Sequence, residues 1–332
     1  MADRPFVSIR DLRRAFDVSK PWLSRVLTGE GRQVLTAVDG VWFDIARGET
    51  FALVGESGSG KSTLGRMVVG LLPPTSGAVT IDGMPMTHPA SAAARHRLRR
   101  RIQMIFQDPY ASLNPRWRVD RIVAEPIRAF GLVRDERTIA ARVGDLLGLV
   151  GLHPEDGRGY RHAFSGGQRQ RQRIAIARAL ASNPDFIVCD EPTSALDMSV
   201  QAQVLNLMRD LQDRFGLTYL FISHNLAVVR HMATRVGVMY LGRLVEVSGG
   251  DLFAAPRHPY TRMLLDAVPD LRFTGRSRLP ISGESANPIH PPAGCALHPR
   301  CPFADERCRR ETPPLLEGVA CHAVHERRTH AL

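Results

Sequence analysis

Short stretches of alternating or fully apolar residues dominate residues 6–54 and predict β-strands. The strands are expected at residues 7–9, 34–44 and 50–54. Residues 19–31, between the first two strands, lack this pattern and are interpreted as a loop insertion. A helix-compatible run at 62–72 follows the third strand and ends at Pro73-Pro74, since proline cannot continue a helix.

Farther along, apolar stretches alternate with segments that are compatible with helices. Strands are expected at residues 79–82, 186–189, 219–223, 236–241 and 243–247, the last two forming a hairpin split by Gly242. Residues 108–180 are expected to be mostly helical, for example at 137–150. This alternation predicts an α/β fold with a mostly parallel sheet and helices on both faces.

The composition changes near residue 255. From Pro256 onward proline, arginine and histidine are frequent and apolar periodicity is weak. A chain of 332 residues can form one large domain with an appendage, or two domains. We therefore expect a domain at 1–255, with a helical subdomain at about 108–180, and an extension at 256–332.

The formal net charge of +11 is spread along the chain. Its densest run, Arg95 to Arg101, fits a solvated helix face or a patch that meets anionic lipid or nucleic acid. No apolar run reaches about 18 residues, so no membrane-spanning helix is predicted. The N-terminus lacks the apolar core of a signal peptide, and we expect the protein to stay in the cytoplasm.

The strongest chemical signal is Gly55-Glu56-Ser57-Gly58-Ser59-Gly60-Lys61-Ser62-Thr63, the G-x-x-x-x-G-K-S pattern of a phosphate-binding loop. It lies between a predicted strand and a predicted helix, as such a loop requires. Of the 44 basic residues only Lys20 and Lys61 are lysines. Lysine is a compact point charge that reaches between phosphates, whereas arginine is a planar fork. The sequence therefore predicts ATP contacts from Gly55, Ser57, Gly58, Ser59, Gly60, Lys61, Ser62 and Thr63.

A second signal is the apolar strand Phe186 to Cys189, which ends in the carboxylates Asp190 and Glu191. A buried strand that delivers Asp190 to its carboxyl end places this side chain near a Mg²⁺ ion held by Ser62. Glu191 is then positioned to polarise the water that attacks the γ-phosphorus. These residues predict ATP hydrolysis rather than binding alone.

Four further features accompany these two signals. Ser165-Gly166-Gly167-Gln168 opens an arginine-rich helical stretch, where exposed N–H groups form an anion site. Asp197 closes the segment Ser194-Ala195-Leu196-Asp197 that follows the carboxylates. His224 follows a predicted strand, from which its ring can reach a γ-phosphate. Gln107, at the start of the helical segment, can contact Mg²⁺ or the attacking water.

In order and spacing, these motifs resemble the ATPase subunits of ABC transporters over about residues 5–250. The resemblance implies a P-loop NTPase fold with a RecA-like core, an antiparallel β subdomain and a helical subdomain. It implies that two such domains pair head to tail, with ATP and Mg²⁺ between the phosphate-binding loop of one and Ser165 to Gln168 of the other. Glu191, His224 and Gln107 would be catalytic, and Gln107 would also meet Mg²⁺. Asp197 would lie among the nucleotide-binding residues.

The same family stacks adenine on an aromatic residue upstream of the phosphate-binding loop. Phe16 is our candidate and Trp22 is its rival. Two departures from the family pattern stand out. Arg169-Gln170-Arg171-Gln172-Arg173 holds one Gln-Arg pair more than usual, so either the pair bulges out or the helix sits differently, since two residues turn a helix by about 200°. Asn225 follows His224 where aspartate is usual, which we expect to matter less.

Four of the five cysteines gather in the extension, at Cys295, Cys301, Cys308 and Cys321, whereas Cys189 is interpreted as a core residue. Disulfides are disfavoured in a reducing cytoplasm. Structural zinc prefers closer pairs, although His298 and His322 could join the cysteines. Four thiolates at irregular spacing can hold a [4Fe–4S] cluster. Unligated thiols remain the fourth alternative.

The extension itself carries a resemblance. Arg257 to Thr261, Gly283-Glu284 and Pro291 to Cys295 are similar to the C-terminal extension of oligopeptide and dipeptide importer ATPases. The stretch Ile174 to Leu180 resembles the second ATPase of their pair. Some members with this tail are described as binding an iron–sulfur cluster, for which a structural staple is the simplest role.

This resemblance implies a peripheral ATPase on the cytoplasmic face of the inner membrane. Its partners would be a paralogous ATPase in a heterodimer, two permease subunits and an extracytoplasmic substrate-binding protein. Di- or oligopeptide cargo is favoured, and nickel, glutathione, opines or oligosaccharides stay open. The second hypothesis, a soluble ABC ATPase acting on nucleic acid or ribosomes, is supported by the charge. The single nucleotide-binding domain argues against it, and no nucleic-acid partner is expected.

Overall fold

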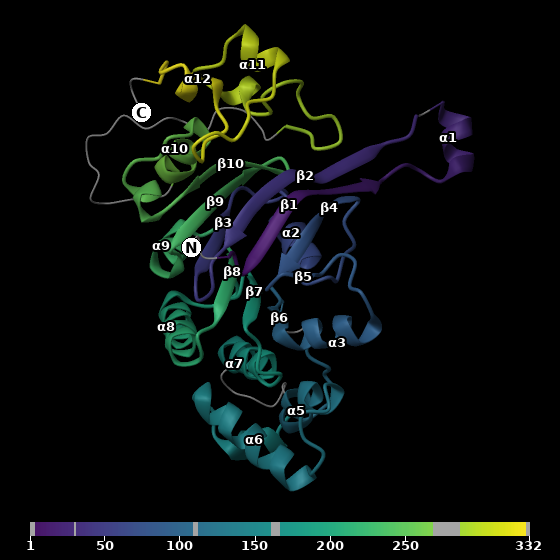
Figure 1. Ribbon diagram of the computed structural model, residues 1–332, viewed down its shortest axis with the longest axis vertical. Coiled ribbons are helices and arrows are strands. Elements are labelled where there is room, and N and C mark those ends of the chain that lie inside the picture. The colour runs from purple at the N-terminus through teal and green to yellow at the C-terminus, as the bar shows by residue number, and fades with distance from the viewer. Residues whose placement is uncertain (1–3, 30, 109–111, 161–166, 268–285, 330–332) are drawn as a thin grey trace.

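The computed structural model describes residues 4–29, 31–108, 112–160, 167–267 and 286–329 (Figure 1). Its centre is a six-stranded sheet with the order β10-β9-β3-β8-β7-β6. The strands β9, β3, β8, β7 and β6 are parallel, and β10 is antiparallel to β9. Their bounds are Thr50–Val54 (β3), Ile102–Ile105 (β6), Phe186–Asp190 (β7), Thr218–Ile222 (β8), Arg235–Tyr240 (β9) and Arg243–Ser248 (β10).

A second, antiparallel sheet has the order β2-β1-β4-β5. It consists of β1 (Val7–Asp17), β2 (Val34–Ile45), β4 (Ser76–Ile81) and β5 (Met84–Pro85). The strand predicted at 7–9 thus continues to Asp17, through several register shifts. The predicted loop insertion contains a short helix, α1 (Trp22–Thr28), at the tip of an arm that projects from the molecule (Figure 1).

Helices lie around and below the central sheet (Figure 1). The segment predicted to be mostly helical contains α5 (Val119–Ala129), α6 (Glu136–Leu149), the 3₁₀ turn η1 (Pro154–Arg158) and α7 (Gly167–Leu180). Helices α2 (Lys61–Val68), α3 (Ala92–Arg101), α8 (Met198–Phe215) and α9 (Leu226–Met232) lie outside that segment and before the extension. This α/β architecture, with separate antiparallel and helical parts, confirms the predicted fold class.

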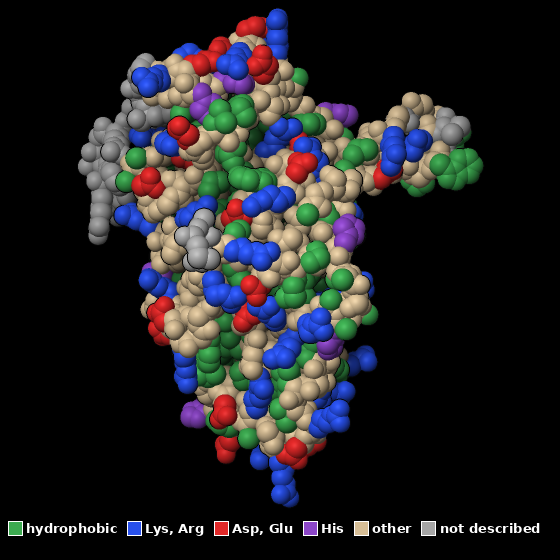
Figure 2. All heavy atoms as spheres, viewed as in Figure 1, with side chains coloured by type: hydrophobic (Ala, Val, Ile, Leu, Met, Phe, Trp, Pro, Cys, Tyr) green, Lys and Arg blue, Asp and Glu red, His purple; other side chains and the backbone are tan. Residues whose placement is uncertain are grey.

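The densest basic run forms helix α3, in which Leu98 is buried while the side chains of Arg95, Arg97, Arg99 and Arg100 are exposed. This exposed basic face is compatible with both interpretations of the run. Lysine and arginine side chains are dispersed over the visible face of the molecule (Figure 2). Within the described residues, no helix has both the length and the apolar character needed to cross a bilayer.

The extension covers the free edge of β10. The 3₁₀ turn η2 (Gly250–Phe253) precedes it, and it contains the helices α10 (Pro259–Asp266), α11 (Glu306–Arg310) and α12 (His322–His325) and the 3₁₀ turn η3 (His298–Arg300). The N–H of Val247 donates to the carbonyl of Gly318 at 2.7 Å, and that of Ala320 donates to Val245 at 2.8 Å. Tyr260 and Leu297 belong to the main hydrophobic core. The extension is therefore packed onto the body of the protein.

Candidate active site

The phosphate-binding loop joins the end of β3 to the start of α2. Gly55 and Gly60 both have positive φ angles, 149° and 100°. A Cβ atom at Gly60 would lie 2.1 Å from the carbonyl oxygen of Ala37, and one at Gly55 would lie 2.2 Å from that of Met239. Only glycine fits these two positions. The close packing fixes the loop between β2 and the end of β9.

Lys61 is buried beneath the loop, with 5% of its surface exposed. Its Nζ donates to the carbonyl oxygens of Gly55 and Glu56, each at 2.8 Å, and to Ser59 Oγ at 3.1 Å. Burial lowers the pKa of Lys61, while the charges of Glu191, Asp190 and Glu56 counteract this shift. The ammonium group thus contacts neutral oxygens that a phosphate can replace.

Ser62 and Asp190 form the second part of the site. Ser62 Oγ donates to Asp190 Oδ1 at 2.8 Å, linking the first turn of α2 to the end of β7. Burial is the main cause of the raised pKa of Asp190, against which the Ser62 hydrogen bond and the charge of Arg66 act. A serine hydroxyl beside a carboxylate is the oxygen donor set that Mg²⁺ prefers, so these two residues fit the ion that the sequence predicts.

Glu191 connects three segments that are far apart in the sequence. Its Oε1 lies 2.9 Å from His224 Nδ1, and its Oε2 accepts from Gln107 Nε2 at 3.1 Å. Gln107 follows β6, Glu191 follows β7 and His224 follows β8, and these three strands are neighbours in the sheet. Parallel strands present their carboxyl ends at one edge, which is where ligands bind in open α/β sheets. The three predicted catalytic residues are thereby brought together.

Asp197 lies just beyond this group, as the N-terminal cap of α8, and its side chain is exposed. The next residue, Met198, has 87% of its surface exposed. Ser194 Oγ donates to the carbonyl oxygen of Glu191 at 3.1 Å. This segment therefore joins Glu191 to an exposed surface that carries the large apolar side chain of Met198.

The predicted anion site at Ser165 and Gly166 lies outside the described residues. Gly167 is the first residue of α7, and Gln168 follows within the helix. Helix α7 continues without interruption to Leu180, so the extra Gln-Arg pair lies within regular helix. Arg173 Nη1 donates to the carbonyl of Val150, just beyond α6. Of the two alternatives, a bulge within α7 is wrong.

The two adenine-stacking candidates lie in different places. Phe16 pairs with Leu35 on β2, two residues from Ala37, against which Gly60 packs. Arg14 lies over the Phe16 ring, 4.6 Å from its centroid. Trp22 lies in α1 at the tip of the projecting arm, with 72% of its surface exposed (Figure 1). Phe16 therefore lies near the loop, and Trp22 does not.

The four cysteines of the extension are free thiols within electrostatic range of one another. Burial raises the pKa of Cys295 to about 11 and that of Cys301 to about 12, and it raises the pKa of Cys321. In the part of the chain that is described, no three His, Cys, Asp or Glu side chains are arranged to hold a metal ion. His298 Nδ1 lies 3.0 Å from the carbonyl of Cys295, and His322 Nε2 lies 3.1 Å from that of Glu311.

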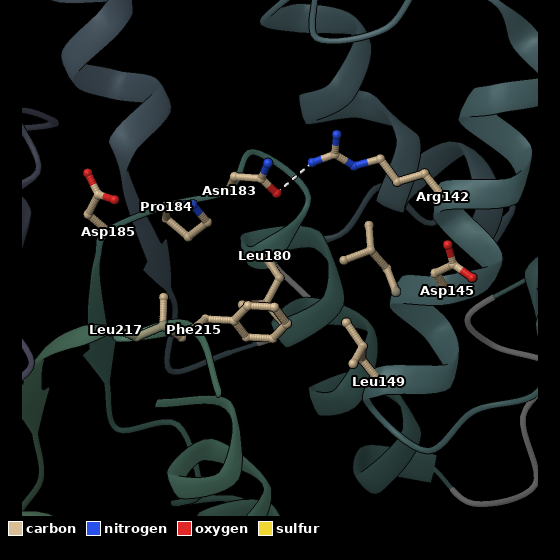
Figure 3. Close-up of a pocket in the computed structure, with 10 residues that line it drawn as sticks. Arg142, Asp145, Leu149, Leu180, Asn183, Pro184, Asp185, Phe215 and Leu217 are labelled. Atoms are coloured by element: carbon tan, nitrogen blue, oxygen red, sulfur yellow. Dashed lines mark hydrogen bonds between the residues drawn. The ribbon is translucent and has the colours of Figure 1, made fainter. Parts of the chain in front are cut away.

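A separate cavity of about 340 Å³ lies between α6 and the central sheet (Figure 3). Leu149, Leu180 and Phe215 line it, and Arg142 donates to Asn183 Oδ1 at 2.6 Å across it. It lies at the amino ends of β7 and β8, opposite the edge that carries Glu191. The cavity is thus distinct from the candidate active site.

Sequence reasoning missed the contact of the loop with the extension. Glu56 Oε1 and Oε2 lie 3.0 Å and 3.1 Å from the guanidinium of Arg300. The backbone N–H of Glu56 donates to Tyr260 Oη at 2.9 Å. Tyr260 lies within a motif that marks the extension, but no spacing in the sequence links it to residue 56.

Comparison with known proteins extends this description. Residues 38–194 match the family described as "ABC transporter", and residues 246–308 match "Oligopeptide/dipeptide transporter, C-terminal region". The chain is 49% identical over 327 residues to the di/tripeptide transport ATP-binding protein DppF of Pseudomonas aeruginosa (strain UCBPP-PA14), covering 96% of this chain and 98% of that protein.

Two other similarities agree. The chain is 46% identical over 322 residues to the oligopeptide transport ATP-binding protein AppF of Bacillus subtilis (strain 168), covering 96% of this chain and 95% of that protein. Its fold is similar to the ATP-binding cassette MJ0796, solved as a dimer in a post-hydrolysis state with ADP and phosphate. The TM-score is 0.63 at 26% identity, over 74% of this chain and 98% of that one.

Proposed function

Because this chain belongs to the ABC transporter ATPases that carry the oligopeptide/dipeptide C-terminal region, we propose that it hydrolyses ATP at this site to power the import of di- and oligopeptides. The observation that carries the proposal is the convergence of Gln107, Glu191 and His224 at one edge of the sheet, beside the loop that holds Lys61.

ATP binding is the first step. Lys61 exchanges its loop oxygens for phosphate oxygens, and the N–H groups of the loop surround the same phosphates. Ser62 and Asp190 supply oxygen ligands for Mg²⁺, which neutralises phosphate charge when it is bound. Phe16 stacks on adenine, since it pairs with Leu35 on β2, the strand whose Ala37 packs against Gly60 of the loop. These groups hold the nucleotide in line for attack.

Hydrolysis depends on Glu191. Its carboxylate accepts a hydrogen bond from the attacking water and directs this water at the γ-phosphorus. The ring of His224 holds one carboxylate oxygen and Gln107 holds the other, so the orientation of Glu191 depends on both. Because Gln107 begins the helical part, a change in the occupancy of the site reaches α5 and α6. In this way the site is coupled to the permease partners of the family.

We propose that a second, paralogous ATPase completes the site through its counterpart of Ser165 to Gln168. Exposed Met198, next to Asp197 and the catalytic edge, offers an apolar contact for this partner. Two permease subunits, a substrate-binding protein outside the membrane and a peripheral place on the cytoplasmic face complete the proposed assembly. The names of the relatives favour peptides over nickel, glutathione, opines or oligosaccharides.

The four cysteines of the extension would hold an iron–sulfur cluster. The donor set is all thiol, and His298 and His322 already have backbone partners, which disfavours a mixed zinc site. Gathering the thiolates requires a shift from their present arrangement. The cluster would act as a structural staple. Iron and sulfide in the anaerobically purified protein would support this assignment, whereas stoichiometric zinc or metal-free protein would contradict it.

The function is tested with the chain purified in mild detergent from its own membranes. Recovery of a second ATPase and two multi-span permeases is expected, and the attached binding protein identifies the cargo. In this complex Glu191→Gln is expected to lower ATP turnover at least about 100-fold, because the base is lost, while ATP binding persists. Unchanged turnover contradicts the catalytic assignment, and recovery of only ribosomal or nucleic-acid proteins contradicts the transport assignment.

A further inference from the structure

Glu56, the second residue of the phosphate-binding loop, is held mainly by the extension. Its carboxylate forms a two-pronged ion pair with Arg300, and its N–H donates to the hydroxyl of Tyr260. These partners lie 244 and 204 residues away in the sequence. Its carbonyl accepts from Lys61. Every polar group of Glu56 therefore has a partner, and only the carbonyl has one within the loop.

The two residues that the extension contributes to this contact, Arg300 and Tyr260, are buried. The side chain of Arg300 is 5% exposed, that of Glu56 is 26% exposed, and Tyr260 is 1% exposed. Arg300 Nη1 also donates to Tyr240 Oη at 3.4 Å, and the rings of Tyr240 and Tyr260 are 4.6 Å apart. The Glu56 carboxylate and the Tyr240 hydroxyl raise the pKa of Arg300, which stays charged. Because both carboxylate oxygens pair with the planar guanidinium, the contact fixes the orientation of the Glu56 side chain as well as its distance from Arg300.

The position of the pair links it to phosphate binding. Lys61 Nζ is bonded to the carbonyl oxygens of Gly55 and Glu56, so a shift of Glu56 moves two of its three acceptors. Loss of the Arg300 guanidinium would leave the Glu56 carboxylate without its partner, only a few bonds from the oxygens that Lys61 contacts. An unpaired carboxylate here would move toward water and would compete with phosphate for Lys61.

We propose that Arg300 and Tyr260 are positioning residues for the phosphate-binding loop, through which the extension sets the affinity of the site for nucleotide. This inference rests on the proposed binding of ATP at Lys61. The extension would then act on ATP binding more than on the chemical step, because Arg300 is aligned with Glu56 and not with Glu191.

The test measures the dissociation constant of a fluorescent ATP analogue, and KM and kcat for ATP, on the purified complex. Arg300→Met is expected to weaken nucleotide binding and raise KM about tenfold, with kcat at saturating ATP within about twofold. Adding Glu56→Gln is expected to restore most of the affinity, because the unpaired charge is removed. Tyr260→Phe keeps the ring and is expected to weaken binding about threefold.

Arg307→Met is the matched control, since Arg307 forms ion pairs with Glu311 and Glu326 within the extension and is half exposed. It is expected to leave nucleotide binding unchanged. Equal weakening in Arg300→Met and Arg307→Met would overturn the inference, as would wild-type affinity in both Arg300→Met and Tyr260→Phe. Lys61→Ala separates the two proposals: if it binds nucleotide normally, the assignment of the site itself fails. If Arg300→Met does not fold, Tyr260→Phe and Glu56→Gln decide.

Discussion

The roles we assign to Phe16 and Trp22 differ because their surroundings differ, not because their side chains differ in chemical type. Phe16 and Trp22 are both aromatic and both precede the phosphate-binding loop. Phe16 pairs with Leu35, two residues from the strand position that touches Gly60, whereas Trp22 lies at the tip of the arm. The sequence could propose both for adenine stacking, because stacking needs only a ring. Choosing between them requires the path of the β1–β2 hairpin.

Phe16→Ala is therefore expected to weaken ATP binding roughly tenfold, since stacking of one base on one ring contributes about 1–3 kcal/mol. Trp22→Ala is expected to bind ATP as the wild type does, and it serves as the matched control. Titration with a fluorescent ATP analogue measures both. If Trp22→Ala weakens binding as much as Phe16→Ala, the choice of Phe16 is contradicted.

The buried ring of His258 makes the stability of the folded chain depend on pH. Its ring Nδ1 accepts the backbone N–H of Tyr260 and caps α10, while the backbone N–H of His258 donates to the carboxylate of Glu246. Burial lowers the pKa of His258 from 6.5 to about 3. The folded chain therefore keeps the ring neutral. Its contribution is full above pH 6.5 and is lost as the pH falls toward 3.

Compared with His258→Asn, the wild type is expected to lose about 2 kcal/mol more stability between pH 7 and pH 5. Asparagine caps a helix but does not titrate. Urea unfolding at the two pH values measures the effect. Parallel loss of stability in both proteins would contradict it.

At the scale of elements, apolar runs located β3, β7 and β8 because strands buried on both faces lack polar positions. The same buried strands positioned Glu191 and His224, so the meeting of these two side chains at one edge of the sheet could be predicted. The ion pair of Glu56 with Arg300 could not, because it joins two polar residues 244 positions apart and leaves no periodic pattern. Helix α1 was missed because seven residues are too few for a clear helical period.

Helix α7 supports a prediction about its extra Gln-Arg pair. Deleting Gln172 and Arg173 places Gln170 and Arg171 at their positions, so the residue types that face α6 are preserved. The segment at Ser165 returns to the spacing of the family and turns by about 200°. ATP turnover of the assembled transporter is expected to rise roughly tenfold, since small misplacements of binding groups cost large factors in rate.

Nucleotide affinity of the deletion variant, measured on the ATPase chain, serves as its control and is expected to be unchanged, because Lys61 is untouched. A fall in turnover would mean that the longer helix is the working arrangement of this protein. Unchanged turnover would mean that the position of Ser165 is set independently of α7.

At the scale of the whole molecule, the expected boundary near residue 255 and the packing of the extension make different predictions for a truncated chain. A chain of residues 1–255 loses Tyr260 and Leu297, which lie in the main core. Burial of each contributes about 1.5–3 kcal/mol. The truncation also exposes the edge of β10, where Val245 and Val247 form backbone hydrogen bonds with the extension. Open strand edges favour aggregation. The truncated chain is expected to unfold at least about 10 °C below the full chain and to aggregate.

Removal of the arm tip is the matched control for this truncation. Replacing residues 22–28 with a short turn removes Trp22 and Leu27, which are 72% and 83% exposed. These two side chains bury little surface, so the unfolding temperature is expected to change by less than about 2 °C. Thermal unfolding with light scattering measures both variants. A truncated chain as stable as the full one would show that the rest of the protein folds without the extension.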